Sequence, residues 1–226
     1  MNDISEEKLV QLREKILSMA REAELKDDPL AWFEELYNAS CGNNTMIPWS
    51  DGEPHPFLVD WAKSNASVGR ALVVGCGLGE DASYLAKIGW NVTAFDISPT
   101  AVEWSSRIHQ GIDIDWRAED LLHLPDTWIG AWDLVVEIHI LQAIPEEIRQ
   151  MAAPKLAPLL APGGNLICIG RYNSSNQEAE GPPWPLSKPF IQSIGRGLNP
   201  VLFDVRNRKQ DEPGVKRYIA TWQRNN

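Results

Sequence analysis

Three glycines at alternate positions end the apolar run in LVVGCGLGED, residues 72–81, and two acids follow them. A strand that ends in such a turn and leads into a helix lets a ligand approach the backbone, because no Cβ intervenes. A dinucleotide site uses GxGxxG, but here Glu80 stands at the third glycine position and Asp81 comes next. Two carboxylates would repel a pyrophosphate by roughly 1 kcal/mol each. The pattern therefore favours a cationic ligand without phosphate, such as S-adenosylmethionine, over a nicotinamide dinucleotide.

Further acids follow the next two predicted strands. Asp96 ends the second strand, where a carboxylate can accept hydrogen bonds from both ribose hydroxyls of a nucleoside. Glu119 and Asp120 follow the third strand, where an acid can accept a hydrogen bond from the adenine amino group. Asp120 is alternatively a helix cap. Ile97 and Leu121 would supply apolar walls for the adenine ring, so the spacing is typical of a nucleoside site.

Transfer of a methyl group from a sulfonium is an in-line displacement, so the protein mainly has to position the nucleophile and exclude water. A general base is needed only when the acceptor must lose a proton. A thiol, with a reference pKa of about 8.5, is often ready at neutral pH, whereas an alcohol is not. His139 is the best candidate for a base, because histidine titrates near neutral pH, and is alternatively a hydrogen-bonded structural residue.

Other candidates for the acceptor pocket lie after the fifth predicted strand. Arg171 could pair with an anionic acceptor or with surface acids, and Tyr172 and Trp184 could line an aromatic cavity or serve as packing. His55 and His123 are expected in loops or at the surface. We expect the pocket above the fourth and fifth strands, in residues 45–49, 137–142 and 171–184.

The elements that must position these residues follow from hydrophobic periodicity. Apolar residues at three- and four-residue steps predict a helix from Ser5 to about Lys26, with shorter helices over 29–38 and 56–65. From Arg70 onward strands alternate with helices, which predicts a mostly parallel sheet covered on both faces. The last two strands, 200–207 and 215–223, are separated only by a polar turn and should form an antiparallel hairpin. The fold class is therefore α/β with a seven-stranded sheet.

Composition limits the partners and the location of the chain. The net charge of −10 over 226 residues makes phosphate backbones and anionic membranes poor partners. The amino terminus is charged where a secretion signal would be apolar, so a cytoplasmic location is expected. The three cysteines form no CxxC pair, so neither a metal site nor a disulfide framework is expected. Nothing in the sequence distinguishes a monomer from a homodimer.

From residue 70 to the end, the chain resembles the class I S-adenosylmethionine-dependent methyltransferases, which have a Rossmann-like fold. The resemblance rests on GCGLGEDA, FDIS, RAEDLLHLP, WDLVVE and LAPGGNLICI. Three shorter segments, TMIPW, DISPTAVEW and GPPWPLS, look like the thiopurine and halide methyltransferase branch, although GPPW stands where that branch tends to carry GPPF. The resemblance implies one methyltransferase domain over 1–226, with a helical lid over 1–66 and a core over 67–226.

The resemblance also implies a role for individual residues. Glu137, at the end of the fourth strand, would face the methionyl group and the reacting methyl of S-adenosylmethionine. Trp49 would close over the cofactor, unless it is a packing residue. Together with the candidates from the residues themselves, the positions expected to bind the cofactor are Trp49, Gly75, Cys76, Gly77, Gly79, Asp81, Asp96, Ile97, Ser98, Glu119, Asp120, Leu121 and Glu137, and those expected to act in catalysis are Glu137, His139, Arg171 and Tyr172.

A small-molecule acceptor is expected, because a lid made by the chain's own amino terminus encloses a small pocket. The branch favours a soft sulfur, selenium or halide nucleophile, and an oxygen or nitrogen acceptor remains open. Two other functions are kept as alternatives: an NAD-dependent oxidoreductase and a non-catalytic module that binds S-adenosylmethionine.

Overall fold

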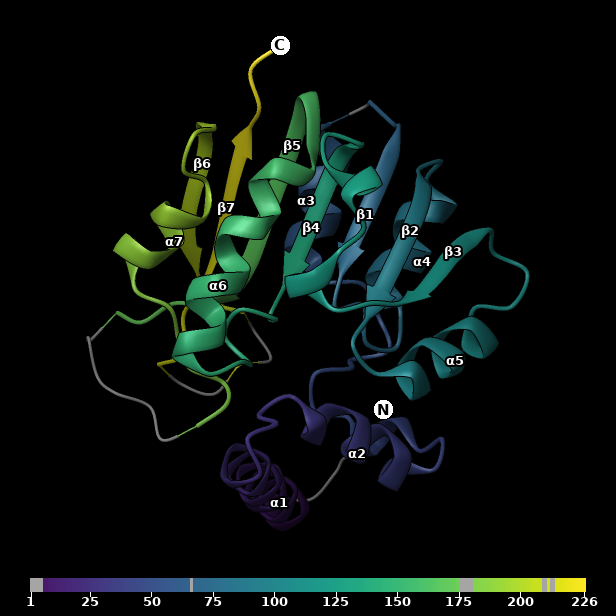
Figure 1. Ribbon diagram of the computed structural model, residues 1–226, viewed down its shortest axis with the longest axis vertical. Helices are drawn as coiled ribbons and strands as arrows, with labels where there is room; N and C mark the ends of the chain where they lie inside the picture. Colours follow the sequence, from purple (N-terminus) through teal and green to yellow (C-terminus); the bar gives the residue numbers. More distant parts are fainter. Residues whose placement is uncertain (1–5, 66, 175–180, 209–210, 212–213) are drawn as a thin grey trace.

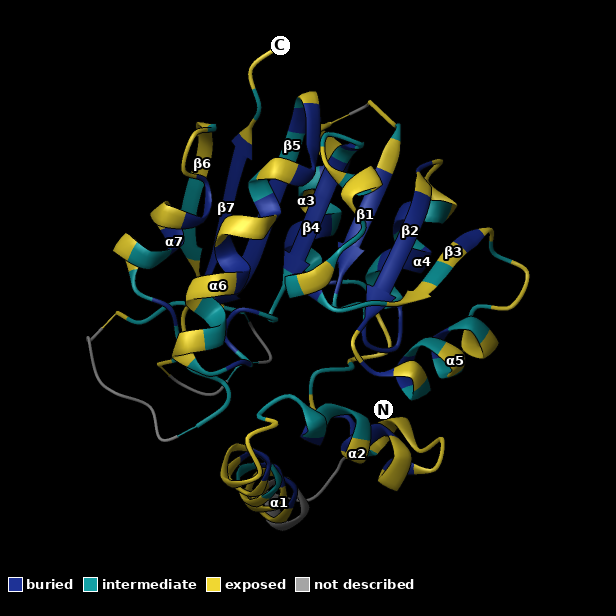
Figure 2. Ribbon diagram, in the orientation of Figure 1, coloured by how far each residue is buried: buried dark blue, intermediate teal, exposed yellow. Residues whose placement is uncertain are grey.

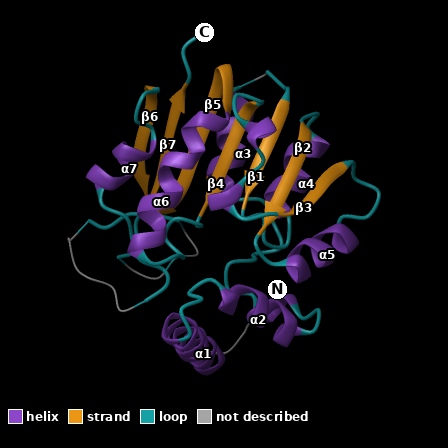
Figure 3. Ribbon diagram, viewed as in Figure 1, coloured by secondary structure: helices purple, strands orange, loops and turns teal. Residues whose placement is uncertain are grey.

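The computed structural model describes residues 6–65, 67–174, 181–208, 211 and 214–226, and places one seven-stranded sheet between helices (Figure 1 and Figure 3). The strand order is β3-β2-β1-β4-β5-β7-β6. The strands are β1 Arg70–Val74, β2 Asn91–Asp96, β3 Ile114–Ala118, β4 Trp132–Ile138, β5 Leu160–Arg171, β6 Asn199–Arg206 and β7 Arg217–Gln223. Strands β1 to β5 pair in parallel, and β7 is antiparallel to both β5 and β6. The predicted fold class, including the carboxyl-terminal hairpin, is confirmed.

The three amino-terminal helices lie within a few residues of the predicted ranges 5–26, 29–38 and 56–65, and four further helices follow in the described residues. They are α1 Glu6–Leu25, α2 Ala31–Ser40, α3 Pro56–Ser64, α4 Glu80–Lys87, α5 Pro99–Ile108, α6 Glu146–Leu156 and α7 Lys188–Ile194, with short 3-10 helices at Asn44–Met46, Leu121–His123, Asp126–Trp128 and Ala157–Leu159. Helix α5 shows why the start of a helix can be predicted from the sequence. Ser98 Oγ accepts a hydrogen bond from Ala101 N–H, and Pro99 occupies the first turn. No helix in these described ranges is long and apolar enough to cross a membrane.

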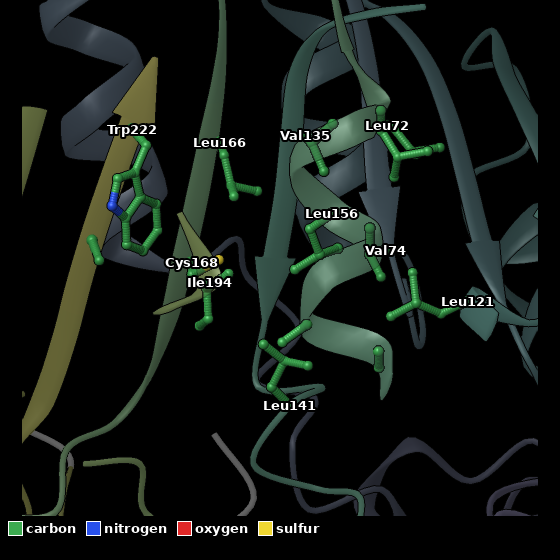
Figure 4. Packing of buried hydrophobic residues seen from close by; sticks show 14 of the residues in the cluster. Leu72, Val74, Leu121, Val135, Leu141, Leu156, Leu166, Cys168, Ile194 and Trp222 are labelled. Carbon is green, nitrogen blue, oxygen red and sulfur yellow. The ribbon is translucent and has the colours of Figure 1, made fainter. Parts of the chain in front are cut away.

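Both faces of the sheet are apolar, and each is covered by a pair of helices. Helices α6 and α7 pack on one face and α3 and α4 on the other (Figure 1). Figure 4 shows Leu156 of α6 over Val74 and Val135 of the sheet. The central strands are buried along most of their length, while β3 and β6 at the two edges carry more exposed residues (Figure 2). This burial on two faces explains why the parallel strands read as continuous apolar runs.

Helices α1 and α2 lie across the edge of the sheet where the parallel strands end (Figure 1). Their apolar faces form a third cluster with two residues of the core, Leu78 of the glycine loop and Ala101 of α5. The amino-terminal helices therefore pack directly on the loops in which a ligand site is predicted.

Candidate functional site

The glycine loop between β1 and α4 depends on its glycines for backbone conformation and for space. Gly75, Gly77 and Gly79 have φ angles of 58°, 54° and 82°, which residues with a Cβ rarely adopt. A Cβ on Gly75 would lie 2.3 Å from Ile140 Cδ1, and a Cβ on Gly79 would lie 2.5 Å from the Trp116 ring. The loop thus exposes backbone rather than side chains at the carboxyl edge of β1.

Asp96 holds this loop from the end of β2. Its Oδ2 accepts a hydrogen bond from Gly77 N at 2.9 Å, and its Oδ1 accepts one from Ser98 N at 3.0 Å. Burial raises the pKa of Asp96, although both backbone bonds oppose that effect. Each carboxylate oxygen has a second lone pair, so the ribose hydroxyls predicted as its partners could still be accepted. Next to it the Ile97 side chain is 37% exposed, which leaves an apolar surface beside a buried carboxylate.

The acids after β3 have local partners. Asp120 Oδ1 accepts from Leu122 N at 2.9 Å and caps the following 3-10 helix, while Asp120 Oδ2 lies 2.7 Å from His123 Nδ1. The structure therefore shows the helix cap that was one of the two interpretations of Asp120. Glu119 N donates to Asp96 O at 3.1 Å, which joins β3 to the nucleoside edge, and contacts of either acid with adenine stay predictions.

The two acids at the start of α4 bind the amino-terminal segment. Asp81 Oδ1 accepts a hydrogen bond from His55 N at 2.7 Å, and Glu80 accepts one from Ser50 Oγ. Burial raises the pKa of Asp81 to about 7, with the nearby Glu80 adding to the effect. The chain segment that follows Trp49 is thus fastened to the helix that begins at the glycine loop.

Trp49 lies beside the glycine loop, where its predicted role requires it. Its Nε1 donates a hydrogen bond to the Tyr37 hydroxyl at 2.9 Å and would lie 3.6 Å from a Cβ built on Gly77. The Trp49 ring also packs edge-on against Trp32 and Phe33 of α2. Closure over the cofactor stays a prediction, and packing within the lid is observed.

Glu137 at the end of β4 is fully buried and holds the turn that follows it. Its Oε1 accepts hydrogen bonds from Ile140 N at 2.7 Å and Leu141 N at 3.0 Å, and it lies beside Cys168 on β5. Burial raises the pKa of Glu137 to about 7. No nitrogen or oxygen donor within the described part of the chain reaches Oε2. Glu137 therefore positions Ile140, whose side chain occupies the space that a Cβ on Gly75 would need. The contact of Glu137 with the methionyl group stays a prediction.

His139 follows with a φ angle of 70°, and its ring nitrogen is engaged. Nε2 lies 2.7 Å from an Arg217 guanidinium nitrogen, and Arg217 also binds both carboxylate oxygens of Asp211, at 2.6 and 2.7 Å. A guanidinium only donates, so His139 Nε2 must accept and the ring is neutral. Burial, with the nearby His55 and Arg217, lowers the pKa of His139 well below its usual value. The structural interpretation of His139 fits this geometry better than the role of a base.

His55 lies in the loop before α3, as the expectation of a loop or surface position allows, but it is buried, with 6% of its surface exposed. Its Nδ1 accepts from Phe57 N at 3.2 Å at the start of α3, which leaves the hydrogen on Nε2. Burial lowers the pKa of His55 to about 3, and the charges of Arg208 and Arg217 add to the effect. The Nε2 of His55 and the Nε of Arg208 have no hydrogen-bond partner in the ranges that the structure describes.

These groups form a cluster rich in N–H donors at the carboxyl edge of the sheet. The rings of His55 and His139 lie edge to face at 5.4 Å, and Arg208 is paired with Asp51 at 2.7 Å. Arg171, at the end of β5, is near enough to lower the pKa of His139. Two buried donors without acceptors destabilise the folded protein unless a ligand supplies the acceptors, so this cluster can hold an anion.

The other residues predicted for the acceptor pocket have packing partners. Tyr172 N donates to Lys216 O at 2.8 Å, and its ring contacts Phe203 edge-on. Trp184 N donates to Gln142 O at 2.7 Å, and the Arg149 guanidinium lies over the Trp184 ring. Residues 175–180 of the predicted pocket lie outside the described residues. His123 is 80% exposed, as expected for a surface residue.

Sequence reasoning missed several members of the site: Glu34, Tyr37, Arg208, Asp211 and Arg217. Arg217 could have been found from the sequence, because it is a charged residue at the start of a largely apolar strand, β7, that is buried in the structure. Tyr37 could not, because it continues the apolar face of α2 and its hydroxyl partner is twelve residues away.

The carboxylates around the glycine loop suit a cationic ligand that has no phosphate. The loop backbone is flanked by Glu80, Asp81 and Asp96, and the exposed face of Ile97 can receive an aromatic ring. A pyrophosphate would meet these carboxylates, whereas a sulfonium and an ammonium group would not be repelled by them. The residues present therefore fit S-adenosylmethionine.

Comparisons with known proteins agree with this geometry. A family model described as thiopurine S-methyltransferase matches residues 38–196. A probable thiol methyltransferase from Arabidopsis thaliana is 31% identical over 175 residues, which is 74% of each chain. A thiocyanate methyltransferase from Brassica oleracea is 25% identical and covers 82% of this chain and 84% of its own.

Solved structures show the same fold. The N-methyltransferase NodS from Bradyrhizobium japonicum, solved with S-adenosyl-L-homocysteine, aligns over 85% of this chain and 98% of its own, with a TM-score of 0.68 and 18% identity. The family model covers well over half of the chain, and a nicotinamide cofactor has no support among these relatives. The chain belongs to the thiopurine S-methyltransferase family and is an enzyme that takes its methyl group from S-adenosylmethionine.

Proposed function

We propose that this enzyme methylates the sulfur of a small thiol or of a comparable soft anion. The observation that carries the proposal is the pair of buried donors without acceptors, His55 Nε2 and Arg208 Nε, next to the Arg217–His139 contact. A thiolate is an acceptor for such donors, and neighbouring cationic groups lower the pKa of a thiol. The thiol and thiocyanate methyltransferases among the relatives support the same class of acceptor.

The hydrogen bond that engages His139 points in the same direction. An alcohol would have to lose its proton to a base, and the Nε2 lone pair of His139 is occupied by Arg217. A thiol needs no such base at neutral pH. In this proposal Arg171 and Tyr172 line the acceptor pocket, and Glu137 holds the turn that separates the acceptor from the glycine loop.

The cofactor would be held by the groups that border the glycine loop. Backbone of Gly75, Cys76, Gly77 and Gly79 would line the methionyl part, Asp96 would accept the ribose hydroxyls, and Ile97 with Leu121 would enclose the adenine. Glu119, Asp120, Asp81 and Ser98 would complete this border, and Trp49 would cover it. Bound there, S-adenosylmethionine supplies a methyl group activated by a positively charged sulfur.

A matched set of acceptors tests the proposal. Benzenethiol, phenol and aniline share one ring and differ in the nucleophilic atom, so transfer of a labelled methyl group can be compared directly. We expect the thiol to react at least about a hundredfold faster than phenol, the size of a typical general-base contribution that phenol would lack. Equal rates for phenol and benzenethiol would contradict the proposal.

The donor cluster is tested separately with an arginine pair. Arg208→Gln should raise the KM for an anionic acceptor such as thiocyanate by about tenfold, because one charge-assisted hydrogen bond is lost. Arg206→Gln is the control, since Arg206 lies two residues away, is 43% exposed, and pairs with Asp204. An equal KM for the two variants would remove Arg208 from the acceptor site.

A further inference from the structure

Tyr37 reaches from the lid to the glycine loop. It lies on α2, is 2% exposed, and its hydroxyl oxygen would be 3.2 Å from a Cβ built on Gly77. Its ring is fixed by edge-on contacts with Trp49 on one side and Trp104 of α5 on the other. The hydroxyl therefore has a defined position beside backbone that lines the cofactor site.

The hydroxyl proton of Tyr37 is available to form a hydrogen bond with a ligand. The indole nitrogen of Trp49 can only donate, so in the 2.9 Å contact the Tyr37 oxygen is the acceptor. Asp96 has the largest charge effect on Tyr37, but the hydrogen bonds to its carboxylate come from Gly77 N and Ser98 N, and none is formed with the Tyr37 hydroxyl. Within the described residues the Tyr37 O–H has no acceptor.

The surroundings of the hydroxyl make it a permanent donor. Burial raises the pKa of Tyr37 well above its usual value, and the negative charge of Asp96 acts in the same direction. The carboxylates of Glu80, Asp81 and Asp96 border the loop, and they would repel the one anionic group of S-adenosylmethionine, its methionyl carboxylate. A neutral O–H donor can bind that carboxylate without pairing with the acids.

We propose that Tyr37 is a cofactor-binding residue whose hydroxyl donates a hydrogen bond to the methionyl carboxylate of S-adenosylmethionine, with Trp49 orienting the hydroxyl. This inference rests on the assigned cofactor and not on the identity of the acceptor, so it survives if sulfur methylation is disproved. It gives the lid a direct contact with the ligand in addition to its contacts with the protein.

The test compares two ligands and does not require turnover. Binding of S-adenosylhomocysteine and of its decarboxylated analogue is measured by titration calorimetry for the wild type and for Tyr37→Phe, which keeps the ring. We expect Tyr37→Phe to bind S-adenosylhomocysteine about tenfold more weakly, because a hydrogen bond to a charged group is lost. The affinity for the decarboxylated analogue should be unchanged.

Each other result overturns the proposal. Unchanged affinity for S-adenosylhomocysteine would mean that the hydroxyl does not contact the ligand, and an equal loss for both ligands would mean that Tyr37 acts only by packing the lid. Tyr84→Phe is the matched control, because Tyr84 lies on α4 and packs against the core behind the sheet. Trp49→Phe should weaken the binding of S-adenosylhomocysteine more than that of the analogue, since the Tyr37 hydroxyl would keep its proton but lose its orienting partner. A Trp49→Phe loss that is equal for both ligands would overturn the orienting role of Trp49.

Discussion

The buried polar side chains of this site are engaged mostly with one another or with backbone. Asp96 holds the glycine loop, Glu137 holds the turn after β4, and His139 accepts from Arg217. Such internal partners fix the geometry of a site before a ligand arrives. Three donors of this site have no acceptor among the described residues, namely His55 Nε2, Arg208 Nε and the Tyr37 proton, and they are places where this enzyme can receive negatively charged atoms.

His139 provides a prediction at the level of one residue. His139→Gln should leave kcat with a thiol acceptor within about threefold of the wild type, because a glutamine oxygen can still accept from Arg217. A general base would contribute roughly a hundredfold or more. The measurement is kcat against pH for both proteins, and a large loss in the variant together with a missing inflection would show that His139 takes a proton.

Residue roles that depend on long-range partners could not be predicted from the sequence. Asp120 was interpretable as a cap because its partner Leu122 is two residues away. His139 and Arg217 are 78 residues apart, and no periodicity in the sequence links them. The loop position of His55 was predictable, but its burial was not: a loop rich in polar residues surrounds it, and the acid and the arginines close to it come from other parts of the chain.

Among the elements, Glu34 connects α2 of the lid to the start of α5 in the core. This α2 carboxylate accepts hydrogen bonds from Thr100 N at 3.2 Å, from Thr100 Oγ1 at 2.6 Å, and from Ser98 Oγ, all at the start of α5. Hydrogen bonds from Ser98 and Thr100 lower the pKa of Glu34, although partial burial opposes them. The amino terminus of a helix favours a negative charge, so the contact suits both partners.

Neutralising this carboxylate should loosen the lid. We expect Glu34→Gln to weaken docking of α2 by about 1 kcal/mol or more, since charge-assisted hydrogen bonds are lost. Amide hydrogen exchange in α2 should then become faster, while exchange in the central strands stays the same. Glu35→Gln is the control, because Glu35 is exposed and lies 4.0 Å from Lys26. Equal exchange in the two variants would show that apolar packing alone holds the lid.

The elements themselves were largely predictable, since their signals are local. The serine and proline that start α5, the alternation of strands and helices, and the polar turn before the last strand all act within a few residues. The way in which α1 and α2 sit on the sheet was less accessible from local patterns. It depends on contacts such as Glu34 with Ser98, which are 64 residues apart, and was expected only from the family resemblance.

For the molecule as a whole, buried acids make stability depend on pH. The pKa values of Asp81 and Glu137 are both raised to about 7, so between about pH 4.5 and pH 7 the folded protein binds more protons than the unfolded chain. The free energy of unfolding therefore falls as the pH rises through this window. His55 acts in the opposite direction between about pH 3 and pH 6.5, because its pKa is lowered.

Glu137→Gln isolates one of these contributions. The glutamine oxygen can keep accepting from Ile140 and Leu141, and no proton is gained or lost at this position. Between pH 5 and pH 8 the wild type should lose more stability than the variant, by on the order of 2 kcal/mol. Urea unfolding at the two pH values measures this difference, to which Asp81 and His55 contribute equally in both proteins. Identical pH dependence would mean that Glu137 is ionised throughout.

The position of the lid also bears on the turnover rate of the enzyme. Glu34 is bound beside the strand end that carries Asp96, and Trp49 and Tyr37 lie against Gly77, so with the proposed placement of the cofactor under Trp49 we expect spent cofactor to leave only when these contacts detach. That placement predicts one opening of the amino-terminal helices in every catalytic cycle. When the acceptor is abundant and reactive, we expect product release and not methyl transfer to determine how many turnovers occur each second.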